Sequence, residues 1–170
     1  MKKIIIFLIC LTFCFGLTAQ TITKIYVLRH ADRTPLGDDL SVLGIKRANV
    51  LKRYFSTTGI NALFSTNTVR TKKTLQPMVT PLMPIKIYDP IPALITQIKT
   101  NFNGRRVVVV GHSNTIPQII TACGCISPFP AIGIPDNQFD NLLLLLVRFN
   151  AVGAPTCELL HNKYGDKTPL

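Results

Sequence analysis

The chain has 170 residues, 47% of them apolar, and a formal net charge of +11 from 19 basic and 8 acidic residues. This length favours a single domain, and the apolar content excludes an intrinsically disordered chain. A basic chain can bind nucleic acid, but this sequence lacks both a recognition helix rich in basic residues and an aromatic platform for stacking bases. We therefore expect no nucleic-acid partner.

The first 19 residues are typical of a secretory signal peptide. Lys2 and Lys3 precede an apolar run over residues 4–17, and Ala19 supplies a small residue before a cut at Gln20. A spanning helix needs about 20 apolar residues, and this run is shorter. We therefore favour cleavage over an uncleaved N-terminal anchor.

A lipid anchor on Cys14 is disfavoured, because bulky Phe13 stands where lipoprotein processing needs Gly or Ala. Removing 19 of the 170 residues, two of them lysines, leaves a mature domain over residues 20–170 with 151 residues and a formal charge of +9. We expect this domain to be exported, either periplasmic or secreted, without stable insertion in a membrane. Its oligomeric state stays open.

Three cysteines remain in the mature chain: Cys123, Cys125 and Cys157. Thiols outside the cytoplasm are usually oxidised, so we expect one disulfide that joins Cys157 to either Cys123 or Cys125. The sequence leaves both pairings open. A zinc site is the alternative, but the Cys-Gly-Cys spacing is shorter than the usual ligand spacing and no clear fourth ligand is present.

Short β-rich runs alternate with helical patterns along the mature chain. A strand over residues 24–28 precedes a helix over 41–55, for which Ser41 is the expected N-cap. The elements that follow, in chain order, are a strand at 62–64, a helix at 69–78, a strand at 85–88, a helix at 91–101, a strand at 106–110, a helix at 115–122, a Pro-rich loop at 127–135 and a strand at 142–149.

This alternation predicts an α/β fold. Residues 106–110 are apolar on both faces, which is typical of a central strand in a parallel sheet that is covered on each side. We expect a single three-layer domain with a mostly parallel central sheet of about five strands flanked by helices. The five leucines at 142–146 are too few to span a bilayer and predict a buried strand, and His161 is expected on the surface of the tail.

Two of the predicted strands end on a histidine. His30 follows the strand at 24–28, and His112 follows the strand at 106–110. Either histidine alone is compatible with a structural role. Ligands of open α/β sheets bind at the carboxyl ends of the strands, however, so neighbouring strands would bring the two rings to one site. The helix after Asn114 would direct its first N–H groups there, which favours an anion.

Arginines gather around the same positions. Arg29 and Arg33 flank His30, and Arg70 lies at the start of the predicted helix at 69–78. Guanidinium groups match phosphate oxygens with two parallel hydrogen bonds. The sequence therefore predicts a phosphate pocket that contains a possible histidine nucleophile.

Four ordered segments resemble the histidine phosphatase superfamily, whose fold is also called phosphoglycerate-mutase-like. They are RHADR at 29–33, LSVLGIKRA at 40–48, STNTVRTKKT at 65–74 and GHSNT at 111–115. The resemblance covers nearly all of the mature chain. The small size is similar to that of the short phosphohistidine-phosphatase members rather than the larger sugar-phosphate mutases.

The resemblance implies that His30 is the nucleophile that takes the phosphoryl group and that water then hydrolyses the phosphohistidine. It implies that Arg29, Arg70 and His112 hold the phosphoryl oxygens. No metal and no other cofactor is expected, because guanidinium groups supply the positive charge that phosphoryl transfer needs.

Other parts of the site are less fully specified by the resemblance. Arg33 is expected to add a phosphate contact, and Asn114 either supports the pocket or only caps the following helix. The glycine that commonly follows the first histidine in the family is replaced by Ala31, a modest departure.

The general acid for the leaving group is the larger departure. Asp89 is the only carboxylate between Arg70 and His112, and its place after a predicted strand suits a general acid. An Asp-Pro pair is also typical of an ordinary turn. The rival carboxylates are Asp32, Asp136 and Asp140.

The main hypothesis is an exported phosphatase that hydrolyses a phosphomonoester or phosphohistidine through a covalent phosphohistidine intermediate. Its partners would be a small phosphorylated substrate or a phosphoprotein. The alternative is a catalytically weak module of the same fold that binds phosphate or a phospholigand. A mutase is disfavoured, because the chain lacks room for the insertions that enclose a sugar phosphate.

Overall fold

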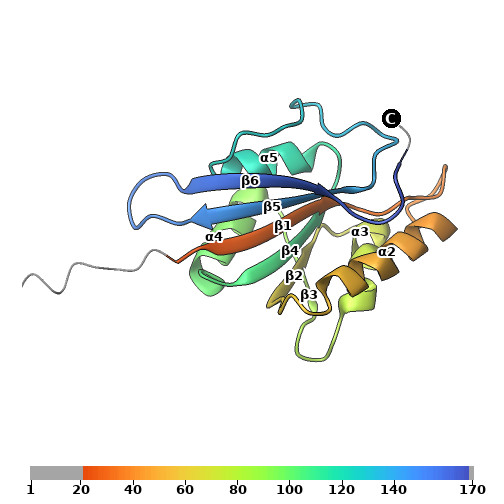
Figure 1. Ribbon diagram of the computed structural model, residues 1–170, viewed down its shortest axis with the longest axis horizontal. Coiled ribbons are helices and arrows are strands. Elements are labelled where there is room, and N and C mark those ends of the chain that lie inside the picture. The colour runs from red at the N-terminus through yellow and green to blue at the C-terminus, as the bar shows by residue number, and fades with distance from the viewer. Residues whose placement is uncertain (1–20, 169–170) are drawn as a thin grey trace, which may run out of the picture.

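The computed structural model describes residues 21–168 (Figure 1). The predicted signal peptide lies outside the described residues. Among those that are described, no helix combines the length and the apolar character needed to cross a membrane.

One six-stranded sheet runs through the domain in the order β3-β2-β4-β1-β5-β6. The pairings β1–β4, β2–β4 and β2–β3 are parallel, whereas β5 runs antiparallel to β1 and β6 antiparallel to β5. The predicted α/β class and the mostly parallel sheet are confirmed. The strands are β1 Thr23–Arg29, β2 Ala62–Ser65, β3 Ile85–Ile87, β4 Arg106–Gly111, β5 Asn141–Arg148 and β6 Thr156–Lys163.

The sixth strand, β6, corrects the expected number of about five. It forms the edge of the sheet and is mostly exposed, so its sequence carries little of the apolar pattern that marks a strand. His161 is exposed, as expected for the tail surface, but it lies within β6 rather than in a free tail. Its Nε2 is 2.8 Å from Oδ1 of Asn141.

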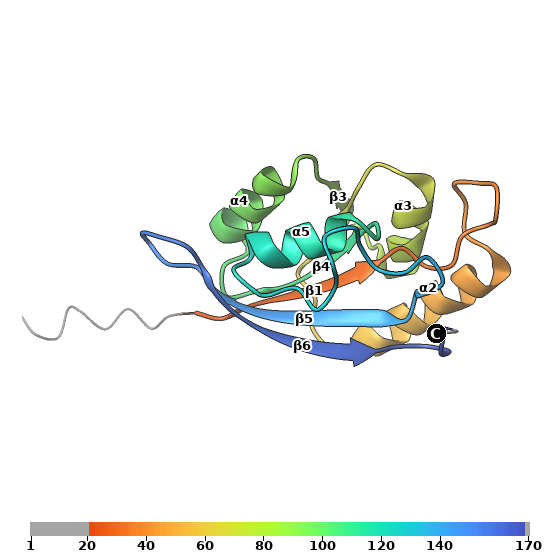
Figure 2. The ribbon, with the colours of Figure 1, turned by 90° about the horizontal axis from the view of Figure 1, so that it is seen from above.

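Two helices cover each face of the sheet. Helices α4 (Ile91–Asn101) and α5 (Thr115–Ala122) pack on one face, and α2 (Val42–Phe55) and α3 (Val69–Leu75) on the other. Figure 2 shows α4 and α5 side by side on one of these faces. The predicted helix at 69–78 ends early as an α-helix and continues as a 3-10 turn over Gln76–Met78. Pro77 lies in that turn, where it has no N–H to continue the α-helical bonding.

The central strands are buried on both faces, as their sequence predicts. Val107 to Val110 in β4 are each 0% exposed, and the leucines of β5 pack into the same two cores. The predicted N-cap is also confirmed, since the Ser41 hydroxyl accepts a hydrogen bond of 3.1 Å from the N–H of Gly44.

Helix α2 makes a close approach to the segment that follows β1. A Cβ atom on Gly44 would lie 2.0 Å from the carbonyl oxygen of Asp32, so only glycine permits this contact. The same carbonyl accepts the Ser41 N–H at 2.9 Å. The start of α2 is thereby held against the segment that carries His30.

A disulfide joins Cys125 to Cys157, and Cys123 is a free, buried thiol. This settles the pairing that the sequence left open, because Cys123 points into the core from the end of α5. The bridge ties the loop after α5 to the start of β6, the exposed edge strand. It therefore anchors an element that has little buried surface of its own.

We expect the double variant Cys125→Ser, Cys157→Ser to lower the free energy of unfolding by roughly 4 kcal/mol, the value for a loop of this length; the two cysteines are 32 residues apart. Urea denaturation under oxidising conditions measures the change. A reducing agent should lower the stability of the unaltered protein to that of the variant and leave the variant unchanged. Equal stability of the two proteins without reductant would contradict the assigned bridge.

Candidate active site

The parallel pairing of β1 with β4 brings the two histidines together. Arg29 is in register with Gly111, the last residue of β4, and the His30 N–H donates to the Gly111 carbonyl at 3.0 Å. The rings of His30 and His112 then lie edge to face, with centroids 5.6 Å apart. The predicted convergence of the two strand ends is confirmed.

The His30 ring is buried and its tautomer is fixed. Its Nδ1 lies 2.8 Å from the carbonyl oxygen of Ala31, which can only accept a hydrogen bond, so Nδ1 carries the proton and Nε2 keeps its lone pair. The backbone at this point is held in turn by the Thr74 hydroxyl, which accepts the Ala31 N–H at 2.9 Å. Burial lowers the pKa of His30 to about 3, and the positive charge of Arg29 and Arg70 adds to the effect. Near neutral pH the ring presents a free Nε2.

His112 has both ring nitrogens engaged. Nη2 of Arg70 lies 3.2 Å from Nδ1 and can only donate, so Nδ1 is the unprotonated nitrogen. Nε2 then donates to the Thr66 hydroxyl at 2.9 Å, and that hydroxyl donates a hydrogen bond to the Thr71 hydroxyl at 3.1 Å. Burial and the nearby Arg70 lower the pKa of His112. This chain of hydrogen bonds holds His112 neutral and orients Arg70.

Arg70 is also held by a carboxylate that the sequence analysis did not identify. One oxygen of Asp38 accepts Nη1 of Arg70, and the other accepts the Val69 N–H at the start of α3 at 2.9 Å. The Val69 N–H and Arg70 keep the pKa of the Asp38 carboxyl below its usual value. Asp38 lies in an irregular loop with no motif around it, so only the folded chain reveals the pairing.

Arg29 is buried beneath the loop that precedes β5. Its Nη1 donates to the carbonyls of Pro135 and Asp136 at 3.0 and 3.1 Å, and its Nη2 pairs with the Asp136 carboxylate at 3.0 Å. Its guanidinium stacks on the Phe139 ring, 4.5 Å from the ring centroid. Arg29 thus fixes this loop over the histidine pair.

These side chains line one open cavity of about 530 Å³, the histidine cavity. The exposed side chains of Arg33 and Asn114 lie at its edge. Asn114 precedes α5 but its side chain makes no capping hydrogen bond, which leaves its amide free for the cavity. The full lining is Arg29, His30, Arg33, Arg70, His112, Ser113, Asn114 and Asp136.

Two buried N–H groups show that the cavity is suited to bind an anion. The Nε–H groups of Arg29 and Arg70 are buried and have no hydrogen-bond partner among the described residues. Unpaired buried donors cost free energy, and an anion placed between the two guanidinium groups would relieve it. The N-terminus of α5 contributes less to anion binding than the sequence predicts, because its first N–H groups, on Thr115 and Ile116, both donate to the carbonyl of His112.

Asp89 lies outside the histidine cavity. It lines an adjoining hollow of about 430 Å³ that shares Asn114 with the cavity and includes Thr66. The Asp89 carboxylate has no hydrogen-bond or ion-pair partner in the part of the chain that the structure describes.

The rival carboxylates have different settings. Asp32 pairs with Arg47 at 2.6 Å, and Asp140 pairs with Lys163 at 2.9 Å, both away from the histidines. Asp136 alone of the three rivals lines the histidine cavity. Within residues 21–168 no group of three His, Cys, Asp or Glu side chains is placed to hold a metal ion.

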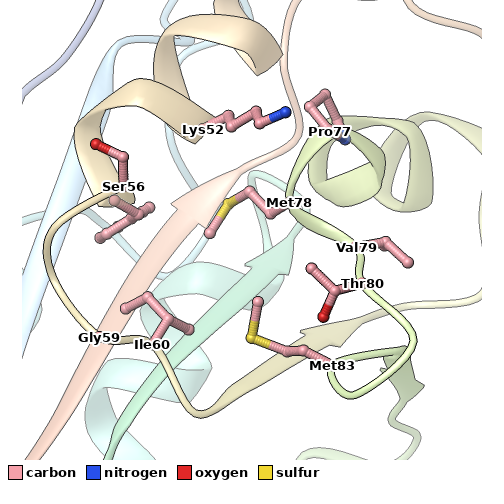
Figure 3. A pocket seen from close by; sticks show the side chains of 10 residues that line it. Lys52, Ser56, Gly59, Ile60, Pro77, Met78, Val79, Thr80 and Met83 are labelled. Atoms are coloured by element: carbon pink, nitrogen blue, oxygen red, sulfur yellow. The ribbon is translucent and has the colours of Figure 1, made fainter.

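A separate hollow of about 370 Å³ lies between the end of α2 and the loop after the 3-10 turn (Figure 3). Met78, Met83 and Ile60 point into it, with Lys52 at its edge. Its lining contains no carboxylate, histidine or cysteine. It lacks the groups that acid–base or nucleophilic chemistry requires, so the histidine cavity is the candidate active site.

Comparison with known proteins gives the fold but no relative in sequence. No family model and no curated protein matches the chain. Solved structures do match. One is a mycobacterial glucosyl-3-phosphoglycerate phosphatase, with a TM-score of 0.63 and 12% identity over 81% of this chain and 97% of that one.

Two further matches have similar scores. A protein assigned as the phosphohistidine phosphatase SixA from Nakamurella multipartitia gives a TM-score of 0.59 and 15% identity over 84% of this chain and 96% of the other. A mutant phosphoserine phosphatase from Entamoeba histolytica, in complex with phosphoserine, gives 0.55 and 13% over 84% and 96%. The chain has the fold of these solved structures, which confirms the phosphoglycerate-mutase-like fold that the sequence predicts.

The lowered pKa of His30 predicts that its ring stays neutral between pH 5 and pH 8. Nitrogen NMR should show the neutral Nδ1–H form of His30 unchanged from pH 8 to pH 5. An unfolded histidine titrates near pH 6.5, so His30 in the urea-unfolded chain serves as the comparison. A His30 titration with its midpoint between pH 5 and 8 would contradict the assigned geometry.

The same shift has a consequence for stability. Between about pH 3 and 6.5 the unfolded chain binds a proton at this histidine that the folded chain excludes. The free energy of unfolding should therefore fall as the pH is lowered, by about 1 kcal/mol between pH 7 and 5.5 from His30 alone. Urea denaturation at the two pH values measures this. A stability that rises on acidification over that range would contradict it.

Proposed function

We propose that the chain is an exported phosphatase that hydrolyses a phosphomonoester or phosphohistidine through a phosphohistidine on His30. The observation that carries the proposal is the fixed Nδ1–H tautomer of a buried His30, which leaves Nε2 as a free nucleophile beside two arginines. The three structural neighbours, which are described as phosphatases, support the same class of reaction.

The reaction would proceed in two balanced steps. Nε2 of His30 attacks phosphorus, the bond from phosphorus to the leaving oxygen or nitrogen breaks, and the leaving group takes a proton. Water then attacks the phosphohistidine and the P–N bond breaks. One proton of the water returns to the acid that protonated the leaving group, and the remaining hydroxyl leaves as part of inorganic phosphate, with His30 restored. Dividing the displacement into two steps lowers each barrier.

The arginines would stabilise the charge on the phosphoryl oxygens. Arg29 and Arg70 now hold the carboxylates of Asp136 and Asp38, and phosphoryl oxygens would take places on the same guanidinium groups and on their unpaired Nε–H groups. For His112 to donate to a phosphoryl oxygen, Nδ1 must be protonated and Arg70 must turn from it to the phosphate.

Asp89 would act as the general acid when the leaving group extends past Asn114 into the adjoining hollow. Its carboxylate is free of partners among the described residues, whereas that of Asp136 is bound by Arg29. A substrate with a good leaving group, such as phosphohistidine or an aryl phosphate, would need this acid least.

A catalytically weak phosphate-binding module is the second candidate. It is favoured by one observation: the only carboxylate in the histidine cavity, Asp136, is paired with Arg29, so no free acid lines the cavity itself. Such a module would bind phosphate without turning over a phosphate ester.

His30→Ala should reduce hydrolysis of an aryl phosphate by roughly 10³-fold or more, because the nucleophile is lost. Quenching the unaltered protein during turnover should give a phosphoryl adduct on the peptide that contains His30, detected by mass spectrometry. His161→Ala is the matched control, since His161 lies in β6 away from the cavity. Undiminished turnover by His30→Ala would refute the nucleophile, and phosphate binding without any turnover by the unaltered protein would favour the module.

Asp89→Asn should slow hydrolysis of alkyl phosphates by roughly 10²-fold and that of aryl phosphates much less, because only a poor leaving group needs the proton. Asp136→Asn is the direct competitor, and Asp166→Asn, with its exposed side chain, is the control for loss of one charge. If Asp136→Asn shows the selective effect and Asp89→Asn does not, Asp136 is the acid. Equal slowing of both substrate types by Asp89→Asn would exclude it.

A further inference from the structure

The aspartates of the domain are gathered at one end of the sheet. All seven lie beyond the carboxyl ends of the parallel strands, in loops and turns at that end. Five of them form the five ion pairs found among the described residues. They are Asp32, Asp38, Asp39, Asp89, Asp136, Asp140 and Asp166.

The opposite end of the sheet carries unpaired positive charge. Lys24 is in register with Arg106 at the starts of β1 and β4, and Arg148 ends the neighbouring β5. Lys99, near the end of α4, donates to the carbonyl of Asn150 at 3.0 Å. With Arg105 these residues form the basic end, and none of the five pairs with a carboxylate in the described part of the chain.

Three of these cations surround one small hollow. Lys24, Arg105 and Arg106 line a space of about 210 Å³ together with Asn61 and Ile22. The one remaining acidic residue, Glu158, also lies at this end, on β6. Glu158 and Lys24 are both in register with Leu146, so β5 separates them, and Glu158 does not line the hollow. Like charges held together without a counter-charge repel one another, so this hollow favours an anionic partner.

The segment that follows the apolar N-terminal run enters the domain at the basic end. Thr21, the first described residue, lies at this end, since its hydroxyl donates to Oδ1 of Asn103 at 3.1 Å, next to Gly104 in the lining of the hollow. Figures 1 and 2 show the chain entering β1 at this end of the sheet. The apolar run at 4–17 ends four residues before Thr21. Four extended residues span at most about 14 Å, less than two Debye lengths of about 8 Å at physiological salt. While the run lies in a membrane, the basic end is thus within electrostatic reach of the lipid headgroups.

We propose that the basic end docks on an anionic lipid surface, with lipid phosphates paired to the cations around the hollow. Until the signal peptide is cleaved, the apolar run keeps the basic end close to the membrane, which favours a lipid surface over other polyanions. The histidine cavity then faces away, because β1 carries it five residues beyond Lys24, about 17 Å along the strand. At that distance the lipid charge is screened and would not repel a phosphorylated substrate.

The test measures binding of the purified chain, with whichever N-terminus its processing leaves, to phosphatidylcholine vesicles with and without about one third phosphatidylglycerol. The ratio of the two affinities cancels any contribution from the apolar run. Each basic residue near an anionic surface contributes about fivefold. The triple variant Lys24→Gln, Arg105→Gln, Arg106→Gln should therefore lower the ratio about a hundredfold, and high salt should abolish it.

The control variant Lys46→Gln, Lys72→Gln, Lys167→Gln has the same net charge but alters cations outside the basic end. Its ratio should stay within about twofold of that of the unaltered protein. Equal losses in the two variants would overturn the proposal, because net charge alone would explain binding. So would the absence of a preference for the anionic vesicles, or equally tight binding to duplex DNA that the triple variant loses. None of the six substitutions touches a residue assigned to the phosphatase site.

Discussion

The candidate site depends on one parallel strand pairing. Register between Arg29 and Gly111, closed by the hydrogen bond from the His30 N–H to the Gly111 carbonyl, sets two imidazoles from distant parts of the chain side by side. A slip of one residue would turn every side chain of β1 to the opposite face of the sheet. The valines of β4 and the leucines of β5 prevent such a slip, because they are buried on both sides of β1. The hydrophobic core thereby fixes the geometry of a polar site at its edge.

The arginines of the site illustrate how a buried cation is kept ready for an anionic ligand. A buried guanidinium needs a partner, or its desolvation is costly. Arg29 and Arg70 meet this need with Asp136 and Asp38, two carboxylates on irregular loops, while one buried N–H of each arginine stays unpaired. When a phosphoryl oxygen replaces a carboxylate, one anion takes the place of another, so neither guanidinium is left without an anionic partner.

The two ends of the sheet serve different electrostatic purposes. At the carboxyl end, five aspartates each pair with an arginine or a lysine. At the amino end, the cations around Lys24 have no carboxylate partner among the described residues, so their charges gather in one place without compensation. The basic composition of the chain therefore does not mean an evenly positive surface. The structure separates a site whose arginines are paired with aspartates from a surface of unpaired cations at the opposite end of the sheet.

The sequence by itself determined the α/β class, the order of the elements up to β5, and the two histidines with their arginines. These features follow from local patterns: apolar runs, caps, and polar residues placed directly after strands. The sequence did not indicate β6, whose exposed edge position removes the apolar pattern. It also did not choose Cys125 as the partner of Cys157, nor find Asp38 beside Arg70, nor separate Asp89 from the histidine cavity. Only the tertiary structure decided these points, because each depends on the distance between segments that are far apart in the chain, which no local pattern encodes.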